Sequence, residues 1–412
     1  MTQITRLPSG LTVVTELRRE VETVSLGVFV TAGTRDETPA EHGLAHFLEH
    51  MAFKGTQRRS AFQTVADVEA LGGDINAETS PEATSYMVRM LAEDWRIGLD
   101  VLLDIVTSPR FEMQDIALEQ DIVCQEIAGA LDVPDDRLVD GIGLAAFGSH
   151  PVGQPILGTE ASVRALDKWA LNGFRERTYA PQATIVSAAG AIDHDSLVRA
   201  LEELTPQFPA KELAQRTVPD FSPGVFLEAR TTHDTHLALA WKAPKFAGEG
   251  SMAHALAMQC LGGGMTSRLF QAIREEAGLA YAIDTYGMIF ADCGLGIVQT
   301  ATSAHTVKPM VERLKLEMAR FADGVKTDEL DSAKRQFRTS LAMAGESMAG
   351  LAARNARHIG VLGHVRPREA IEAEIDAASP QDVQQCWAAI MHDGAFAKAA
   401  VGDAAALDLW AV

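Results

Sequence analysis

Residues 43–51 read Gly-Leu-Ala-His-Phe-Leu-Glu-His-Met, and this stretch organises the interpretation of the whole chain. His46 and His50 are four positions apart, so a helix would bring both imidazoles to one face. Glu49 lies three positions after His46 and shares that face. Two imidazoles and a carboxylate at this spacing can hold zinc and place a base beside the open position of the metal. The pattern H-x-x-E-H, the reverse of H-E-x-x-H, therefore predicts a zinc site on a helix.

A zinc site of this kind needs a third protein ligand from elsewhere in the chain. Glu119 and Glu126 lie seven positions apart on a predicted helix over 113–131, so two turns bring them to one face. Either could be the third ligand, with the other supporting the ligands from behind. The alternatives are ordinary: solvated helix glutamates, and a pair of half-buried histidines in a row that His42 extends.

Length, composition and charge narrow the class of protein. The chain has 412 residues and a formal charge of −20. Its length suggests two or three domains at roughly 150 residues each, and its apolar content is that of a globular protein. The negative charge argues against nucleic acid as a partner, because phosphate binding needs clustered Lys and Arg. An acidic surface would attract basic peptides, although many proteins are acidic only for solubility.

The sequence shows no targeting or membrane segment. Residues 1–8 lack a charged segment followed by an apolar run, and no run of about eighteen apolar residues occurs. The four cysteines are scattered without a C-x-x-C pair, which fits reduced thiols. We therefore expect a cytoplasmic protein with no membrane span.

Hydrophobic periodicity predicts strands and helices mixed within each half of the chain. Besides the helix that carries His46, the first half has expected strands at 11–17, 23–31, 74–80, 83–88 and 183–189, and expected helices at 61–71, 92–106, 113–131, 170–177 and 197–204. Residues 135–164 are expected to be rich in loops. The stretch 206–223 carries four prolines and is the candidate linker between two halves.

The second half begins like the first, with an expected strand at 236–242, a loop and a helix at 252–261. If His254 is aligned with His46, then Ala257 and Met258 take the places of Glu49 and His50. A duplicated unit in which one copy kept the metal residues would look like this, and His254 would be a packed histidine.

Further elements of the second half complete the expected fold. Strands are expected at 282–286 and 294–301, and helices at 268–276, 307–322, 328–344, 348–362 and 380–391. Gly262–Gly264 lacks a phosphate-binding pattern and is expected to be a flexible loop. We predict an α+β fold with two homologous α/β sandwich domains. The first, 1–210, would carry the zinc site, and the second, 220–412, would lack it.

Motifs along most of the chain resemble those of the M16 (pitrilysin-type, inverzincin) zinc metallopeptidases. The resemblance is closest to the β subunit of the mitochondrial processing peptidase and its short bacterial relatives. It rests on residues 7–14, 32–37, 43–56, 71–77 and 262–281. It implies one zinc ion per chain, and a chain that forms half of a clamshell-shaped chamber.

The resemblance also implies a role for each motif residue at the zinc site. His46 and His50 would be zinc ligands, and Glu49 would be the general base. Val123-Cys124-Gln125-Glu126-Ile127 matches the context of the family's distal ligand. Glu126 would therefore be the third ligand, and Glu119 its supporting carboxylate.

Substrate contacts are implied at two further places. Asn76 and Ala77 would lie on an edge strand that pairs with extended substrate backbone. Arg274 and Tyr281, seven positions apart, match a pair that holds substrate near the metal. The alternative for this pair is a helix salt bridge and a core tyrosine. In long family members the pair comes from the half opposite the zinc, so we predict a homodimer in which Arg274 and Tyr281 complete the partner's site.

Taken together, these features predict a zinc endopeptidase that cleaves unfolded or short peptides, basic ones among them. The alternative is a non-catalytic scaffold subunit, or the active subunit of a heterodimeric processing peptidase. Members with a non-catalytic role lose H-x-x-E-H, so its presence here favours the enzyme.

Overall fold

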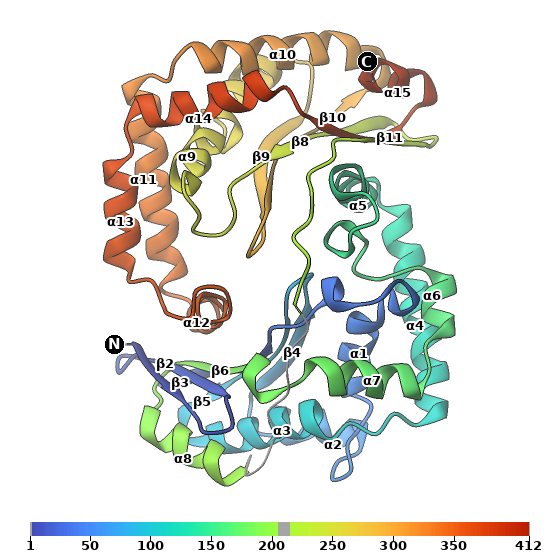
Figure 1. The fold of residues 1–412 in the computed structure, drawn as a ribbon, viewed down its shortest axis with the longest axis vertical. Coiled ribbons are helices and arrows are strands. Elements are labelled where there is room, and N and C mark those ends of the chain that lie inside the picture. The colour runs from blue at the N-terminus through green and yellow to red at the C-terminus, as the bar shows by residue number, and fades with distance from the viewer. Residues whose placement is uncertain (1, 205–214, 412) are drawn as a thin grey trace. The chain divides into compact units, whose positions relative to one another are not determined.

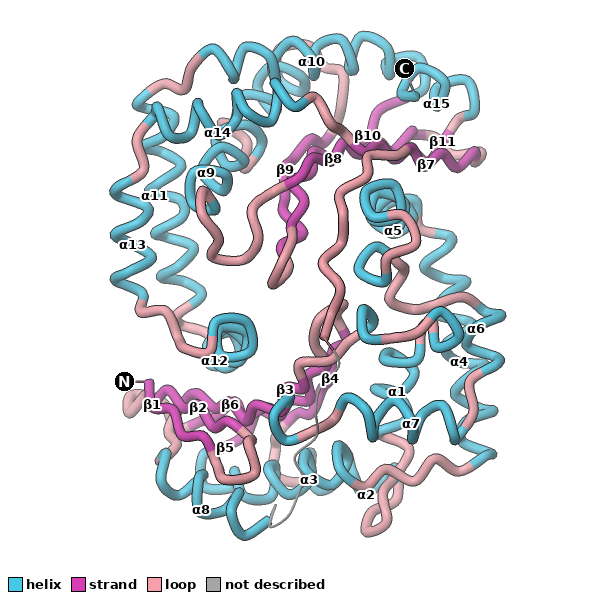
Figure 2. The backbone as a smooth tube through the Cα atoms, in the orientation of Figure 1, coloured by secondary structure: helices cyan, strands magenta, loops and turns pink. Residues whose placement is uncertain are grey.

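The computed structural model describes residues 2–204 and 215–411. The chain forms two compact units, each built on one sheet (Figure 1; Figure 2). Unit 1 comprises Met1–Ala128, Pro155–Arg216 and Ala342–Arg366, and unit 2 comprises Gly129–Gln154, Thr217–Leu341 and Pro367–Val412. The predicted mixture of strands and helices in an α+β fold is confirmed. Residues 206–214 of the expected linker lie outside the described residues.

The sheet of unit 1 has the order β1-β2-β6-β3-β5-β4. Of its described strands, β2 and β6 pair in parallel and the other neighbours pair antiparallel, and β4 forms one edge. The strands are β1 (Thr2–Arg6), β2 (Thr12–Leu17), β3 (Thr23–Val30), β4 (Asp74–Thr79), β5 (Thr84–Leu91) and β6 (Thr184–Gly190).

Helices cover both faces of this sheet, because successive strand residues point to opposite sides. Val13 and Val28 pack with α3 (Trp95–Thr107) and α8 (His194–Leu204). Val14 and Phe29 directly follow Val13 and Val28 in the sequence. They pack with α12 (Met348–Leu362) on the other face (Figure 1). Unit 1 is therefore a layered α/β sandwich.

A second apolar cluster of unit 1 holds the helix that carries the two histidines. This helix, α1 (Leu44–Ala52), buries Leu44, Phe47, Leu48 and Met51, as its sequence predicts. They pack against α4 (Met113–Asp132), α6 (Glu160–Ala165) and α7 (Lys168–Thr178). Helix α2 (Ala61–Glu69) also belongs to unit 1, and its Val68 packs in the first cluster, with α3.

The sheet of unit 2 has the order β7-β11-β8-β10-β9. Its strands are β7 (Val225–Ala229), β8 (Asp234–Lys242), β9 (Ala282–Ile289), β10 (Gly294–Ser303) and β11 (Ala397–Gly402). One face packs on α5 (Pro134–Phe147). The other packs on α9 (Ser251–Gly262), α10 (Val307–Asp323), α14 (Pro380–Asp393) and α15 (Ala404–Ala411). Unit 2 also contains α13 (Arg368–Ala377) and most of α11 (Thr327–Ala344).

The two sheets share one topology once β1 is set aside. In each, a parallel pair (β2 with β6, β7 with β11) is followed by three antiparallel pairings that end at an edge strand, β4 or β9. In each, a helix follows the central strand: α1 follows β3 and α9 follows β8. This common order supports the expected duplication.

Each half of the sequence also gives one helix to the other sheet. The compact units differ in this from the predicted ranges 1–210 and 220–412, because α5 belongs to unit 2 and α12 to unit 1. The prediction that 135–164 is rich in loops is wrong over α5. Its glycines are packing positions: a Cβ on Gly141 would lie 2.2 Å from the ring of Phe226, and one on Gly143 would lie 3.0 Å from Gly153 O.

Several short elements were not predicted: β1, β7, β11, α6, α13 and α15. The expected helix over 268–276 is present in part as a π-helix at Phe270–Glu275. Among the described residues, no helix is both long enough and apolar enough to cross a membrane.

Candidate metal centre

The start of α1 is fixed by Gly43 and Glu37. Gly43 has a φ of 88°, a left-handed conformation that favours glycine, and a Cβ there would meet Leu157 O at 2.7 Å. The Glu37 carboxylate accepts the backbone N–H groups of Gly43 at 2.9 Å and Ala45 at 2.7 Å. These bonds satisfy two of the N–H donors that a helix N-terminus leaves open.

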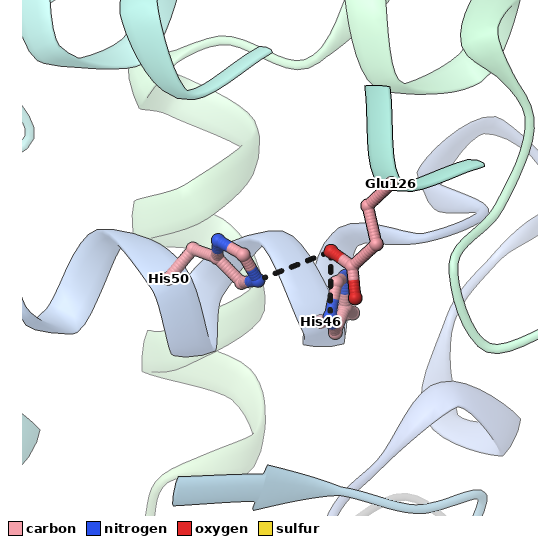
Figure 3. Close-up of side chains that lie close together, drawn as sticks. All are labelled: His46, His50 and Glu126. Atoms are coloured by element: carbon pink, nitrogen blue, oxygen red, sulfur yellow. Dashed lines mark ion pairs between the residues drawn. The ribbon is translucent and has the colours of Figure 1, made fainter. Parts of the chain in front are cut away.

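His46, His50 and Glu126 converge on one point (Figure 3). Glu126 Oε2 lies 3.7 Å from His46 Nε2 and 3.6 Å from His50 Nε2. One ligand atom from each residue lies within 4.8 Å of the others. Donors on a tetrahedral zinc ion, with bonds of about 2.1 Å, would be separated by about 3.4 Å. The donor types and their spacing therefore fit a zinc ion.

The protonation of His46 suits a metal ligand. Burial, together with the charge of His50, lowers the pKa of His46 to about 4. The imidazole is then neutral near pH 7, and a neutral imidazole has a lone pair to donate to a metal. Glu126 is exposed, whereas only 7% of the surface of His46 is.

His50 is oriented from behind by Glu119. His50 Nδ1 donates to Glu119 Oε1 at 2.8 Å, and Lys54 Nζ forms an ion pair with the other oxygen of Glu119. With the proton on Nδ1, Nε2 is left to coordinate a metal. Burial opposes ionisation of Glu119, but its bonds with His50 and Lys54 outweigh this and lower its pKa.

The structure therefore separates the two glutamates that the pattern left equivalent. Glu126 reaches the Nε2 atoms, and Glu119 supports His50 from the opposite side of the ring. Glu119 is only 3% exposed, so the alternative of a solvated helix glutamate is wrong for this residue.

Glu49 lies on the same helix and bonds to a residue that the sequence did not suggest. Its Oε2 accepts the hydroxyl of Thr79, the last residue of β4, at 2.5 Å. Burial raises the pKa of Glu49, while the hydrogen bond from Thr79 and the charge of His50 lower it. Sequence offers no signal for this contact, because the two residues are 30 positions apart.

Asn76 and Ala77 lie on β4, whose second edge is unpaired within the described part of the chain. Asn76 Oδ1 accepts the N–H of Ala77 at 2.9 Å. Because β5 pairs only one side of β4, this edge has the geometry that strand addition requires.

Arg274 and Tyr281 lie together in unit 2. The Arg274 guanidinium lies over the rings of Phe270, at 4.6 Å, and Tyr281, at 4.9 Å. Tyr281 is 83% exposed, so the alternative of a core tyrosine is wrong. Arg274 also lies 3.6 Å from Glu275, a loose ion pair. The pair belongs to a π-helix and the residues after it, and such segments recur at functional sites.

The second copy carries no comparable cluster among the described residues. His254 is buried and accepts a hydrogen bond from Trp241 Nε1 at 3.1 Å. Burial lowers the pKa of His254 to about 4. It is a packed histidine, as predicted.

An α+β fold with a two-histidine, one-glutamate cluster defines a candidate zinc-binding protein. Two family models match the chain: Insulinase (Peptidase family M16) at residues 12–160 and Peptidase M16 inactive domain at residues 166–337. The chain belongs to peptidase family M16.

Relatives and solved structures agree with this membership. An uncharacterized zinc protease of Rickettsia bellii is 33% identical, over 92% of this chain and 93% of its own length. The uncharacterized zinc protease YmxG of Bacillus subtilis is 32% identical, over 91% and 92%. A peptidase M16 inactive domain from Pseudomonas fluorescens superimposes with a TM-score of 0.90 at 18% identity, covering 98% of both chains. A protease from Helicobacter pylori gives 0.89 at 18% identity, over 97% and 99%. At this identity the two structures show the fold alone.

Proposed function

We propose that the protein is a zinc-dependent endopeptidase that hydrolyses unfolded or short peptides. The observation that carries this proposal is the convergence of His46 and His50 of α1 with Glu126 of α4, on the helix that also carries Glu49. The names of the relatives, which are called zinc proteases, support it. The second half would bind no zinc, since Ala257 and Met258 replace Glu49 and His50 there.

The residues of unit 1 would divide the chemistry among them. His46, His50 and Glu126 would hold one zinc ion, which when bound supplies Lewis-acid polarisation of the scissile carbonyl and a more acidic water. Glu49 accepts the proton of the attacking water and delivers it to the leaving amine. Glu119 keeps the Nδ1 proton of His50 in place.

Substrate would be held by backbone pairing at the edge of β4. An extended peptide added beside Asn76 and Ala77 is read by its backbone more than by its side chains. Folded substrates would be poor, because their backbone groups are already paired. The formal charge of −20 would favour basic peptides.

The active form would be a homodimer in which Arg274 and Tyr281 serve the metal site of the partner subunit. What supports this is the exposure of Tyr281 and its stacking with Arg274, an arrangement free to contact a ligand. At that position the pair would hold substrate and stabilise the oxyanion.

Metal content and cleavage, measured on the same preparations, test the proposal. Wild-type protein should contain about one zinc ion per chain by elemental analysis and cleave an unstructured basic peptide in a chelator-sensitive way. Glu126→Gln should lose both properties. Glu49→Gln should keep zinc and lose roughly 10²- to 10⁴-fold in kcat. Wild-type protein with neither zinc nor cleavage would favour a scaffold subunit. Zinc retained in Glu126→Gln would show that the Glu126 carboxylate is not needed to hold the metal.

A further inference from the structure

Glu49, the proposed general base, accepts a hydrogen bond from a single hydroxyl group at the end of β4, the strand proposed to pair with substrate. Thr79 Oγ1 donates to Glu49 Oε2 at 2.5 Å, and no described residue donates to Glu49 Oε1. One carboxylate oxygen is thus fixed by the protein, and the other is left for proton transfer. Thr79 follows Asn76 and Ala77 on the same strand.

Thr79 itself has little freedom. It is paired with Thr84 across the β4–β5 hairpin, and the buried hydroxyl of Thr84 donates to Ala32 O at 3.0 Å. A β-branched side chain in a strand has few accessible χ1 rotamers. The direction of the Thr79 hydroxyl is therefore largely set by the backbone.

The turn that follows Thr79 is bound to the loop before α1. Thr34 N donates to Ser80 O at 3.3 Å and Arg35 N to Pro81 O at 3.0 Å. The approach is close enough that a Cβ on Gly33 would lie 2.0 Å from Ser80 O. The same loop continues to Glu37, which caps α1. These contacts therefore fix the position of strand β4 relative to the helix that carries Glu49.

We infer that Thr79 is a positioning residue that orients Glu49 for proton transfer, so that one strand both seats the substrate and aims the base. This inference rests on the proposed peptidase function. A hydroxyl at this position is required, whereas a methyl group is not. Serine should serve in place of threonine, and valine, which has the same shape without the hydroxyl, should not.

Kinetics of Thr79→Val and Thr79→Ser test this role. Thr79→Val should lower kcat roughly tenfold to a hundredfold, with KM and zinc content unchanged, because a misplaced catalytic group costs rate without costing binding. Thr79→Ser should recover most of the loss. Ser80→Ala is the matched control: its hydroxyl bonds within the turn to Ala83, at 2.9 Å, and its kcat should stay near wild type. A kcat of Thr79→Val within twofold of wild type would overturn the inference.

A measurement that does not depend on activity tests the contact between Thr79 and Glu49 separately from the proposed peptidase function. In zinc-loaded protein, Thr79→Val should lower the thermal midpoint less in a Glu49→Ala background than in wild type, because the bonded partner is already gone. Equal shifts in both backgrounds would overturn the contact, whether or not peptides are cleaved. Unequal shifts in a protein that cleaves no peptide would overturn the proposed function and leave the contact standing.

Discussion

Glu119 and Glu126 differ in their surroundings rather than in their chemistry. Glu119 is enclosed between His50 and Lys54, while Glu126 is exposed and faces the Nε2 atoms of both histidines. Spacing alone could show that both lie on one face of α4, but it could not show which one reaches the metal side. That distinction depends on the rotation of α4 against α1, which is set by packing residues such as Val123 and Phe47. The hydrogen bond between Thr79 and Glu49 could not be predicted from the sequence either, since it also depends on tertiary packing.

Removing the charge of Glu119 should weaken zinc binding without abolishing it. Glu119→Gln keeps the shape of the side chain but accepts the His50 proton less strongly, so zinc affinity should fall roughly ten- to a hundredfold. Competition with a chromophoric chelator measures this. Glu112→Gln, an exposed glutamate just before α4, is the control and should bind zinc like wild type. If Glu119→Gln bound zinc as tightly as wild type, Glu119 would not support the metal ligands.

At the scale of elements, the N-terminus of α1 predicts a pH dependence of stability. Burial raises the pKa of Glu37 from its ordinary 4.5 to about 8, although the N–H groups of Ala45 and Gly43 oppose the shift. A raised folded-state pKa means that the folded protein holds this proton more tightly than the unfolded chain does. Its contribution to stability is complete below about pH 4.5 and is lost as the pH rises toward 8.

The free energy of unfolding of wild type should therefore fall, relative to Glu37→Gln, by roughly 1 kcal/mol per pH unit between pH 5 and 8. Denaturant unfolding of chelator-treated protein across this range measures the difference. The amide that Glu37→Gln introduces has one acceptor oxygen for the two backbone N–H groups, and this loss costs stability equally at every pH. His46 titrates in both proteins and cancels. Parallel curves for the two proteins would show that Glu37 does not titrate in this window.

Elements whose signals are local were predictable, and those fixed by distant partners were not. The pattern of β4 and β5 follows from alternation within one hairpin, and α12 was predicted at Met348–Leu362, its observed bounds. By contrast, β1, β7 and β11 are short strands that owe their state to pairing within a sheet. In α5, glycine lowers helix propensity, and only the approach of Phe226 to Gly141 shows why it is tolerated.

At the scale of the whole molecule, the two sheets repeat one topology, yet each is covered on one face by a helix from the other half of the sequence. The apolar face of α5, including Leu138 and Ile142, packs on unit 2, and Leu351 and Ile359 of α12 pack on unit 1. Hydrophobic periodicity indicates that a helix has an apolar face but not which sheet will bury it. The exchange was therefore invisible in the sequence. It also means that neither half of the sequence alone contains a complete unit.

Family resemblance and the exposure of Tyr281 lead to a prediction about assembly that mixed dimers can test. If Tyr281 serves the partner's metal site, a dimer of one Glu49→Gln and one Tyr281→Phe subunit has one intact site: the Glu49 of the second subunit faces the Tyr281 of the first. A statistical 1:1 mixture with two-fold symmetry should recover about a quarter of wild-type activity, although each parent is impaired. Co-expression with two affinity tags yields the mixed dimer for assay. Pairing Glu49→Gln with Glu126→Gln is the control, because both changes lie in unit 1 and neither arrangement restores a site. A mixed dimer no more active than its better parent would place Tyr281 and Glu49 of one subunit in the same site, or exclude Tyr281 from the reaction.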